Sequence, residues 1–409
     1  MEQFKIAIIG GGAAGLISAI SALQSGCQSV AIFESNPRCG TKILMSGGSR
    51  CNITNESVSP ADFYGGNRNF IKNVLNAFSN KSALQLFDSL GLILKRESSG
   101  KYFPANDSAS GVLDAMLREI RKHSGTIHLS AKVEDIKPCN NGFLISARNN
   151  EFMADKVILT TGGMSYPSTG SDGNGYQLAR RLGHSIITPF PSLSPLLLNE
   201  PELTALSGIT IHAKLTLFLD NKKLMDSEQS LLFTHFGLSG PAPLNISREI
   251  ERLKGADIKL YLNTLPDFSY ESMKMFLKEK TGTHPDKQVF SIFREMLPQS
   301  LCSALFEVSG VPPDRRFCNL SKAEAKQLTT AFISYELRFT GIKGFKQAEV
   351  TAGGVPLTEV KYQTMESKLQ NNLFLSGEIL DVDGKIGGYN FQWAWSTGYI
   401  AGKSVALCP

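Results

Sequence analysis

The cysteines of this sequence follow no recognisable pattern. Seven are spread over 409 residues, and none forms a C-x-x-C pair or a zinc-binding spacing. Cys39 and Cys51 stand too far apart to match the closely spaced pair of a redox-active disulfide beside a cofactor. The sequence therefore predicts no disulfide framework, no metal site, and a reducing, cytoplasmic environment.

Charge blocks, repeats and low-complexity segments are also missing. The formal net charge is +5 and the sequence pI is about 8.7, without a run of basic residues, so no nucleic-acid partner is expected. The apolar run at residues 6–23 is crowded with glycine and preceded by only Lys5, which fits neither a signal peptide nor a membrane span. A chain of this length exceeds what one hydrophobic core usually serves, so we expect two or three domains.

The best-defined motif that is present lies near the N-terminus. FKIAII reads as a buried strand, GGGAAG follows at once, a helical pattern comes next, and a second strand, SVAIFE, ends at Glu34. In such a G-x-G-x-x-G turn, Gly10 permits the tight turn, Gly12 lets the backbone approach a pyrophosphate, and Gly15 lets the helix pack on the strand. An acid at the place of Glu34 accepts hydrogen bonds from ribose hydroxyls. The pattern predicts dinucleotide binding.

Only one such fingerprint is present, but four more glycine-rich segments follow it. They are TKILMSGGSRCNITN, KVILTTGGMSYPSTGSDGNGYQLARRLG, EVTAGGV and NLFLSGEILDVDGKIGGYN. FAD is long and needs backbone-rich contacts from its adenine to its isoalloxazine ring, which several such segments together can supply. We therefore predict FAD as the bound cofactor, held without a covalent link.

These segments resemble the BaiN-type (YhiN-like) family of NAD(P)/FAD-dependent oxidoreductases, which includes aminoacetone oxidase. The resemblance covers essentially the whole chain and is carried by SGGSRCNITN, GGMSYPSTGSDGNGY, FTHFGLSGPAPL, TMESK and GEILDVDGKIGGYNFQWAWSTG. It implies a Rossmann-like FAD-binding domain of the glutathione-reductase type. One departure is Thr41, where we expect arginine, so Arg38 or Arg50 is the alternative for a phosphate contact.

The stretch IGGYNFQWAWSTGYIAG places a glycine-hinged helix start near the end of the sequence. The resemblance implies that this helix points its N-terminus at the pyrimidine edge of the flavin. Free N–H groups and the positive end of a helix dipole stabilise the negative charge of a reduced flavin. Gly387 and Gly388 leave room for that approach, whereas Trp393 and Trp395 are interpreted as packing residues.

The predicted cofactor contacts belong to these glycine motifs and their neighbours. Thr351 is expected beside the isoalloxazine and Glu378 beside the ribityl chain. Cys51 is either structural or a thiol whose pKa is lowered by a helix N-terminus or by Arg50. The full set is Gly10, Gly12, Ala13, Ala14, Gly15, Glu34, Ser35, Lys42, Ser46, Gly47, Arg50, Cys51, Asn52, Val133, Thr161, Gly162, Gly163, Thr169, Gly170, Thr351, Gly353, Gly377, Glu378, Asp381, Gly387, Gly388, Tyr389 and Asn390.

The flavin motifs leave a long central part of the sequence unassigned, which we expect to be an insertion. Alternating patterns such as ITIHAKLTLFLD predict strands, followed by a helix capped by Ser239 with Pro241 at its first position. Four helical patterns then predict a small helical subdomain before a return strand. The fold class is therefore α/β with an inserted β-rich domain. The predicted boundaries are 1–192 and 347–409 for the FAD-binding domain, 193–265 and 334–346 for the β-rich insertion, and 266–333 for the helical subdomain.

An insertion of this kind usually covers a substrate pocket, because pockets form readily where domains meet. The candidate catalytic residues are Tyr166, His235 and Tyr389, although a lone histidine at a strand end is more often structural. The predicted reaction is hydride transfer at flavin N5 involving a small organic molecule. Either an amine or similar donor passes electrons to oxygen, or NAD(P)H reduces the flavin, which then reduces an activated C=C bond. A flavin-dependent RNA-modifying enzyme and a non-enzymatic flavin-binding protein are the alternatives, and the sequence does not set the oligomeric state.

Overall fold

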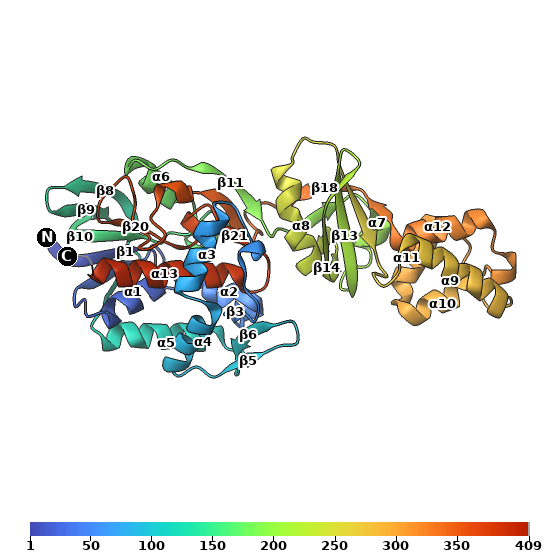
Figure 1. The fold of residues 1–409 in the computed structure, drawn as a ribbon, viewed down its shortest axis with the longest axis horizontal. Helices are drawn as coiled ribbons and strands as arrows, with labels where there is room; N and C mark the ends of the chain where they lie inside the picture. Colours follow the sequence, from blue (N-terminus) through green and yellow to red (C-terminus); the bar gives the residue numbers. More distant parts are fainter. Residues whose placement is uncertain (408–409) are drawn as a thin grey trace. The chain divides into compact units, whose positions relative to one another are not determined.

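The structure, a computed structural model, describes residues 1–407. The chain forms two compact units, one made of residues 1–191 with the chain from residue 348 onward, the other of residues 192–347 (Figure 1). Each unit contains a hydrophobic core of its own. Within the described part of the chain, no helix combines the length and the apolar character needed to cross a membrane.

A seven-stranded sheet forms the centre of the first unit. β1 pairs in parallel with β2 and β10, and β10 pairs in parallel with β20. Because the carboxyl ends of parallel strands meet at one edge, Gly10, Glu34 and Thr160, which follow β1, β2 and β10, lie at the same edge. In sheet order the strands are β7 (Thr126–His128), β2 (Val30–Phe33), β1 (Glu2–Ile9), β10 (Asn150–Leu159), β9 (Gly142–Ala147) and β8 (Val133–Cys139), with β20 (Leu373–Leu375) beside the end of β10.

Two helices from opposite ends of the chain pack against each other in this unit, α1 (Ala13–Gln24) and α13 (Tyr389–Leu407) (Figure 1). A Cβ at Gly398 would lie 2.2 Å from Ile17 Cγ2, and one at Gly402 would lie 2.2 Å from the Ser18 carbonyl oxygen. The absence of side chains at these two positions lets the helices approach closely. The other helices of the unit are α2 (Thr41–Ser49), α3 (Arg68–Ala77), α4 (Asn80–Ser89), α5 (Ala109–Lys122) and α6 (Asn174–Arg181).

Three small sheets complete the first unit. One of them, β11 with β19, joins the two chain segments that flank residues 192–347. The ends of the intervening segment therefore start from neighbouring strands. The small sheets are β3 (Thr54–Asn55), β6 (Lys101–Pro104) and β5 (Leu94–Arg96); β4 (Phe63–Tyr64) and β21 (Asp383–Gly384); and β11 (Ile187–Ser192) and β19 (Val350–Gly354).

The second unit is built on a seven-stranded antiparallel sheet that curls until its edges meet. β17 and β18 lie at opposite edges, yet only Arg338 separates them in the chain. The single return strand that the sequence predicts is therefore wrong. The chain bends at Arg338, whose N–H donates to the Glu200 carboxylate and whose carbonyl oxygen accepts from the Asn199 N–H at 2.8 Å. In sheet order the strands are β17 (Tyr335–Leu337), β16 (Ile258–Asn263), β13 (Thr210–Leu219), β14 (Lys222–Thr234), β15 (Gly237–Ser239), β12 (Leu196–Leu198) and β18 (Phe339–Ile342).

The four helices predicted between residues 266 and 333 are confirmed, and they share the core of the curled sheet. The rings of Phe293 and Phe332, on two of these helices, lie 4.1 Å apart within that core. The predicted cap at Ser239 is wrong, because Ser239 is paired in β15 and Gly240 is the residue before the helix, whereas Pro241 occupies the first position as expected. The helices of the unit are α7 (Pro201–Thr204), α8 (Pro241–Arg252), α9 (Tyr270–Thr283), α10 (Val289–Met296), α11 (Gln299–Ser309) and α12 (Lys322–Ile333).

Candidate functional site

The loop between β1 and α1 has the shape that the G-x-G-x-x-G motif predicts. Gly10 has a φ of 109°, and a Cβ on Gly15 would lie only 1.9 Å from the Gly10 carbonyl oxygen, so a side chain fits at neither position. Around Gly12, by contrast, no atom lies within 4 Å of a Cβ position, which leaves open space. No side chain caps α1, so the N–H groups at its start, including those of Ala13 and Ala14, are left for an external acceptor such as a phosphate.

Glu34 follows β2 and holds this loop in place. Its buried carboxylate accepts the N–H groups of Gly11 and Asn36, each at 2.8 Å, and the Ser35 hydroxyl at 3.2 Å. A carboxylate offers about four acceptor positions, so these three bonds leave room for one more donor. The ribose contact of Glu34 stays a prediction, and the structure adds a second role in tying the glycine loop to β2.

Further predicted residues surround the end of β2. The Asn36 side chain donates to the Thr169 carbonyl oxygen at 2.8 Å, and a Cβ at Gly170 would lie 2.9 Å from Ser35 Oγ. The carbonyl oxygen of Val133 already accepts from a side-chain amide of α6 at 2.9 Å. The structure thus brings these residues together, but the Val133 carbonyl oxygen has one of its acceptor positions filled by the protein.

A hydrogen-bonded hub connects four segments that are far apart in the sequence. The Lys42 ammonium group donates to the Glu378 carboxylate at 2.9 Å and to the Ser165 hydroxyl oxygen at 3.0 Å. The same carboxylate accepts the Ser165 hydroxyl at 2.8 Å and the Thr351 N–H at 2.9 Å. Thr351 Oγ1 in turn accepts the two N–H groups that follow Gly163. These bonds fix Lys42, Thr351 and Glu378 in one place, with the Thr351 oxygen occupied as an acceptor.

Helix α2 breaks where the SGG motif stands. Ser46 has an extended backbone, Gly47 is left-handed with a φ of 56°, and the Cys51 N–H donates back to the Ser46 carbonyl oxygen at 3.1 Å. Cys51 is fully buried, and that burial raises the pKa of its thiol to about 12. The predicted alternative of an acidified Cys51 is therefore wrong, because the lost hydration outweighs the hydrogen bond with Ser46, which lowers the pKa.

Arg50 is held by protein groups. Its guanidinium donates to the Glu97 carboxylate at 2.7 Å and lies over the Phe103 ring, 4.1 Å from the ring centroid. The charge of Arg50 is thus already paired in this structure. Its predicted contact with a cofactor phosphate would require this pair to open.

The start of α13 is fitted to the segment that follows α2. The Gly388 N–H donates to the Asn52 side-chain oxygen at 3.0 Å when this amide is oriented to satisfy both of its ends, and the Asn55 side chain donates to the Gly387 carbonyl oxygen at 3.1 Å. Gly388 has a φ of 92°, and a Cβ there would lie 2.7 Å from the Thr54 carbonyl carbon. The protein's own backbone thus requires Gly388, whether or not a flavin lies near it.

Asn390 and Gly377 are also tied to neighbouring backbone. The Asn390 amide accepts the Gly384 N–H at 2.7 Å and donates to the Gly384 carbonyl oxygen at 2.9 Å. The Gly377 N–H donates to Thr397 Oγ1 at 2.9 Å, and a Cβ at Gly377 would lie 2.7 Å from Ala14 Cβ. The Gly377 turn therefore lies beside the start of α1.

Two other predicted residues lie against backbone in the same unit. Asp381 accepts the Gly66 N–H at 3.2 Å, and a Cβ at Gly353 would lie 2.6 Å from the Thr188 carbonyl oxygen. The first contact links the segment after Gly377 to the start of α3, and the second holds β19 against β11. Both residues help to shape the loops that carry the other predicted contacts.

Both tryptophans are buried, as their interpretation as packing residues predicts. The indole N–H of Trp395 donates to the Ile53 carbonyl oxygen at 2.9 Å, and that of Trp393 donates to the Gly377 carbonyl oxygen at 3.3 Å. They anchor α13 to the two segments that its first turn adjoins.

The three candidate catalytic residues fall in different surroundings. Tyr166 is half-buried with a φ of 48°, and burial together with the nearby Glu349 raises the pKa of its phenol. Burial and the nearby Asp62 raise the pKa of Tyr389 to about 12. His235 is exposed on a hairpin of the second unit. Both tyrosines therefore stay protonated at neutral pH.

Two charged residues that the sequence reasoning missed adjoin this region. Lys101 of β6 is half-buried, and its Cε lies 3.6 Å from a Cβ position at Gly387. Glu349 precedes β19 and interacts electrostatically with Lys101 and Tyr166. No motif distinguishes Lys101 in the sequence, whereas Glu349 is the first residue of the EVTAGGV segment, in which only Thr351 and Gly353 are predicted contacts.

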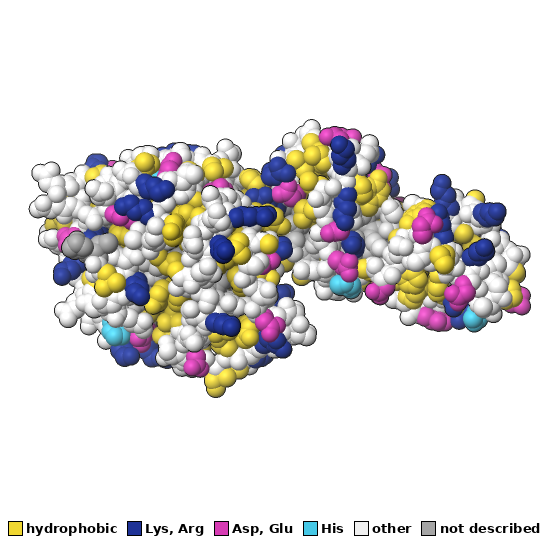
Figure 2. Space-filling model, in the orientation of Figure 1, with side chains coloured by type: hydrophobic (Ala, Val, Ile, Leu, Met, Phe, Trp, Pro, Cys, Tyr) yellow, Lys and Arg dark blue, Asp and Glu magenta, His cyan; other side chains and the backbone are white. Residues whose placement is uncertain are grey.

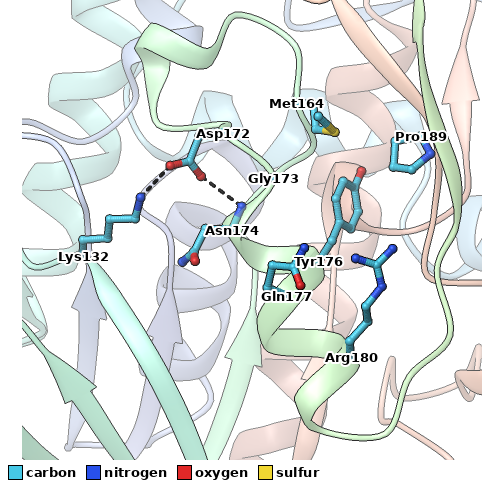
Figure 3. Close-up of a pocket in the computed structure, with 9 residues that line it drawn as sticks. All are labelled: Lys132, Met164, Asp172, Gly173, Asn174, Tyr176, Gln177, Arg180 and Pro189. Carbon is cyan, nitrogen blue, oxygen red and sulfur yellow. Dashed lines mark hydrogen bonds and ion pairs between the residues drawn. The ribbon is translucent and has the colours of Figure 1, made fainter.

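A hollow of about 480 Å³ lies along α6 in the first unit (Figure 3). Lys132 and Asp172 form an ion pair of 2.6 Å at one end, and Tyr176 extends between Met164 and Pro189 (Figure 3). Burial, assisted by the Glu378 and Asp381 carboxylates, raises the pKa of Tyr176. The remaining lining residues are Gly173, Asn174, Gln177 and Arg180.

Two buried hydroxyl oxygens near the glycine motif after β10 have no hydrogen-bond partner in the described part of the chain, those of Thr161 and Tyr176. The neighbouring Gly162 has a φ of 71° and adjoins the Ser171 side chain. Unpartnered buried oxygens are uncommon in native proteins and point to a missing partner such as a ligand or water. Together with the uncapped start of α1 and the open space at Gly12, they fit a bound dinucleotide.

Comparison with known proteins agrees with this geometry. The chain matches the family model described as "HI0933-like protein Rossmann domain" over residues 4–404. It is 36% identical to the 3-dehydro-bile acid delta(4,6)-reductase of Clostridium scindens, over 99% of this chain and 100% of that protein. It is 34% identical to the ribosomal RNA dihydrouridine synthase of Haemophilus influenzae, over 98% of both chains, and 32% identical to that of Escherichia coli, over 99% of this chain and 98% of that protein.

A solved structure shows the same fold at much lower identity. The 3-ketosteroid delta1-dehydrogenase from Sterolibacterium denitrificans matches with a TM-score of 0.52 and 12% identity, over 99% of this chain and 100% of that chain. At this identity the likeness concerns the fold alone. The family match extends over nearly the whole chain, however, and includes every glycine motif described above. The chain belongs to the HI0933-like family and is an FAD-dependent oxidoreductase.

Proposed function

We propose that this protein reduces a C=C bond conjugated to a carbonyl group, with NAD(P)H as the source of electrons. The observation that carries the proposal is the identity of 32% to 36%, over at least 98% of the chain, to proteins whose names describe such reductions. Both Δ4,6-reduction of a 3-dehydro bile acid and formation of dihydrouridine add hydrogen across a C=C bond conjugated to a carbonyl. Bound FAD, once reduced, supplies a hydride for such an addition.

In this proposal, different residues of the chain bind different parts of FAD. The uncapped start of α1 and the open side of Gly12 would hold the pyrophosphate, and Glu34 would hold the ribose. The start of α13 and the half-buried Lys101 would offer positive charge to a bound flavin, which favours its acceptance of electrons. The Lys42–Glu378 pair holds the segments between these two ends.

Anaerobic mixing tests this function. Protein with bound FAD is mixed with NADH or NADPH while the flavin absorbance is followed, and the reduced protein is then mixed with cyclohexenone. Cyclohexanone, which lacks the C=C bond, is the control. We expect a nicotinamide to bleach the flavin and only the unsaturated ketone to restore its colour.

The same assay separates the reductase from the oxidase that the resemblance also implies. An oxidase takes electrons from an amine such as aminoacetone without a nicotinamide, and oxygen restores its flavin with release of peroxide. Bleaching by the amine alone, with no response to cyclohexenone, would contradict the proposed function.

A second candidate is the reduction of uridine in RNA, which the names of the two ribosomal RNA dihydrouridine synthases favour. A net charge of +5 is compatible with RNA, but on the face drawn in Figure 2 the Lys and Arg side chains are interspersed with acidic ones. Ribosomal RNA that lacks the modification is incubated with reduced protein, and dihydrouridine is measured by mass spectrometry. Dihydrouridine formation, together with RNA binding that weakens steeply with salt, would favour RNA over a small substrate.

A further inference from the structure

The hollow along α6 has the features of a second ligand site in the first unit. Its volume of about 480 Å³ is within the range usual for small-molecule pockets, and none of the residues that line it is a predicted FAD contact (Figure 3). The sequence carries only one dinucleotide fingerprint, which the loop after β1 and the start of α1 account for. NAD(P)H, the proposed source of electrons, therefore needs a binding site of its own.

Tyr176 is the buried polar residue of this hollow. Its side chain extends from α6 between Met164 and Pro189 (Figure 3), and only 3% of the residue is exposed. Its hydroxyl oxygen has no hydrogen-bond partner among residues 1–407. Burial raises the pKa of the phenol, so the group stays protonated and is a hydrogen-bond donor at neutral pH. Because a buried donor without an acceptor is costly, this hydroxyl points to an acceptor on a bound molecule.

Arg180 supplies the uncompensated charge of the hollow. Its exposed guanidinium forms neither an ion pair nor a side-chain hydrogen bond within the described part of the chain, and it extends in the direction of Tyr176 and Pro189 (Figure 3). At the other end of the hollow, Lys132 and Asp172 compensate one another in an ion pair of 2.6 Å. A guanidinium presents paired donors that match the oxygens of a phosphate. The side of the hollow that holds Tyr176 and Arg180 therefore suits an anionic ligand.

The Met164 side of the hollow is tied to a residue that is predicted to lie beside the flavin. The Met164 N–H donates to Thr351 Oγ1 at 2.8 Å, and Thr351 is expected beside the isoalloxazine ring. The Gly173 N–H donates to the Gly163 carbonyl oxygen at 3.1 Å, which joins the start of α6 to the glycine motif after β10. A ligand in the hollow would thus adjoin the loop that carries several predicted FAD contacts.

We propose that this hollow binds NAD(P)H with one of its phosphate groups on Arg180, an inference that rests on the proposed function. The Tyr176 hydroxyl donates to an oxygen of the same ligand, and Met164 and Pro189 contact its apolar part. NAD(P)H gives up a hydride with its two electrons, is oxidised to NAD(P)⁺, and leaves the FAD reduced. The group on Arg180 is either the diphosphate, which NADH and NADPH share, or the 2′-phosphate, which NADPH alone carries.

Arg180→Met tests the phosphate contact, because it removes the charge and keeps much of the length of the side chain. FAD-loaded protein is mixed anaerobically with increasing NADH or NADPH, and the rate constants of flavin bleaching give a dissociation constant and a limiting rate constant for each. In Arg180→Met the dissociation constant should rise roughly tenfold or more, with a similar limiting rate constant. Arg180→Lys should restore part of the affinity. A rise for both nucleotides assigns the diphosphate to Arg180, and a rise for NADPH alone assigns the 2′-phosphate.

Tyr176→Phe tests the buried hydroxyl in the same assay. It keeps the ring and removes a donor that has no partner among residues 1–407, so the FAD-loaded protein should resist heat at least as well as the wild type. The dissociation constant for the nicotinamide nucleotide should nevertheless rise. A rise in the dissociation constant for FAD, with that for the nicotinamide nucleotide unchanged, would show that the hydroxyl donates to FAD and would contradict its place in an NAD(P)H site.

Arg181→Met is the matched control, because it removes the same charge from the next residue of α6, which does not line the hollow. Arg181 is exposed and pairs with Asp135 at 3.2 Å, a surface contact of little energetic weight. Its dissociation constants for NADH and NADPH should equal those of the wild type. In every variant, the FAD content and the reoxidation of dithionite-reduced protein by cyclohexenone should match the wild type, because neither requires the nicotinamide nucleotide.

The possible results distinguish this inference from the proposed function. An Arg180→Met protein with wild-type dissociation constants for both nucleotides overturns the NAD(P)H site and leaves the reductase intact. An equal rise in Arg180→Met and Arg181→Met contradicts the site as well, because the effect would then come from the overall charge of α6. If neither nucleotide bleaches the flavin of the wild type, the proposed function is overturned and this inference with it.

Discussion

At the scale of single residues, Glu34 combines a structural task with a predicted binding task. Its carboxylate holds the N–H groups of Gly11 and Asn36, which set the glycine loop against β2. An acid placed in this way is already oriented and desolvated before a ribose arrives. The side chain therefore loses little freedom on binding, which strengthens its contribution to affinity.

Glu34→Ala should weaken FAD binding more than it weakens the fold. A hydrogen bond to a charged acceptor is worth roughly 1.5–3 kcal/mol, so the dissociation constant should rise by about one to two orders of magnitude. Titration of FAD-free protein with FAD measures the change, and Glu151→Ala, at an exposed position of β10, is the control. An unchanged dissociation constant in Glu34→Ala would refute the ribose contact.

The buried thiols are a second feature at this scale. Burial raises the pKa of Cys39 and of Cys51 to about 12, so almost none of either thiol is ionised at neutral pH. Cys139 and Cys318 are exposed. Maleimide labelling of the native protein followed by peptide mapping should modify Cys139 and Cys318 and leave Cys39 and Cys51 unmodified until the protein is denatured. Rapid native labelling of Cys51 would show that its surroundings open in solution.

The sequence indicates individual residues only where their partners are near in the chain or their type has one use. Gly10, Gly15 and Glu34 belong to one contiguous motif, so their roles follow from spacing alone. Lys101 of β6 and Glu349, which precedes β19, interact electrostatically only because the fold brings these distant segments into the same region. An isolated lysine or glutamate carries no signal of that kind, and both residues were missed.

At the scale of elements, the pairing of α1 with α13 depends on the lack of side chains at Gly398 and Gly402. α13 thereby fixes its own first turn, which lies beside Asn52 and Asn55. A displacement of α13 along α1 would carry Gly387 and Gly388 away from those residues. The C-terminal helix thus couples the packing of the sheet to the geometry of the candidate site.

Two glycine-to-alanine changes in helices should have opposite effects. A Cβ at Gly402 would lie 2.2 Å from the Ser18 carbonyl oxygen, and overpacking of this kind costs roughly 1–3 kcal/mol, more than the helix propensity gained. At Gly111 of α5 the nearest atom is 3.6 Å away, so Gly111→Ala should stabilise by up to about 1 kcal/mol. Thermal unfolding of FAD-free protein measures both. Equal shifts in the same direction would mean that α13 does not pack on α1 as described.

Helices and strands with a continuous apolar periodicity were predictable from the sequence. Strand boundaries that depend on pairing between distant segments were not. The strand–loop–helix–strand start of the chain and the four helices of the second unit follow from apolar periodicity. The division of residues 334–346 into β17 and β18 does not, because it arises from the contacts of Arg338 with Asn199 and Glu200 across the curled sheet. Single-sequence periodicity cannot reveal such a bend.

At the scale of the whole molecule, the predicted cofactor contacts all lie outside the inserted residues 192–347. All predicted FAD contacts lie in residues 1–191 or beyond residue 347, within the unit that has the parallel sheet and its own core. The insertion leaves from β11 and returns to β19, and these two strands pair with each other. The first unit therefore contains the sheet, the core and the predicted contacts that an independent FAD-binding domain needs.

Replacement of residues 192–347 by a short glycine–serine linker should yield a folded protein that still binds FAD. The linker has only to join the ends of two paired strands, so its closure costs little conformational entropy. Circular dichroism tests folding, and FAD titration compares the dissociation constant with that of the full chain, which we expect to be similar. Glu34→Ala in the shortened protein should weaken binding as it does in the full chain. A shortened protein that folds but fails to bind FAD would mean that residues 192–347 supply essential cofactor contacts.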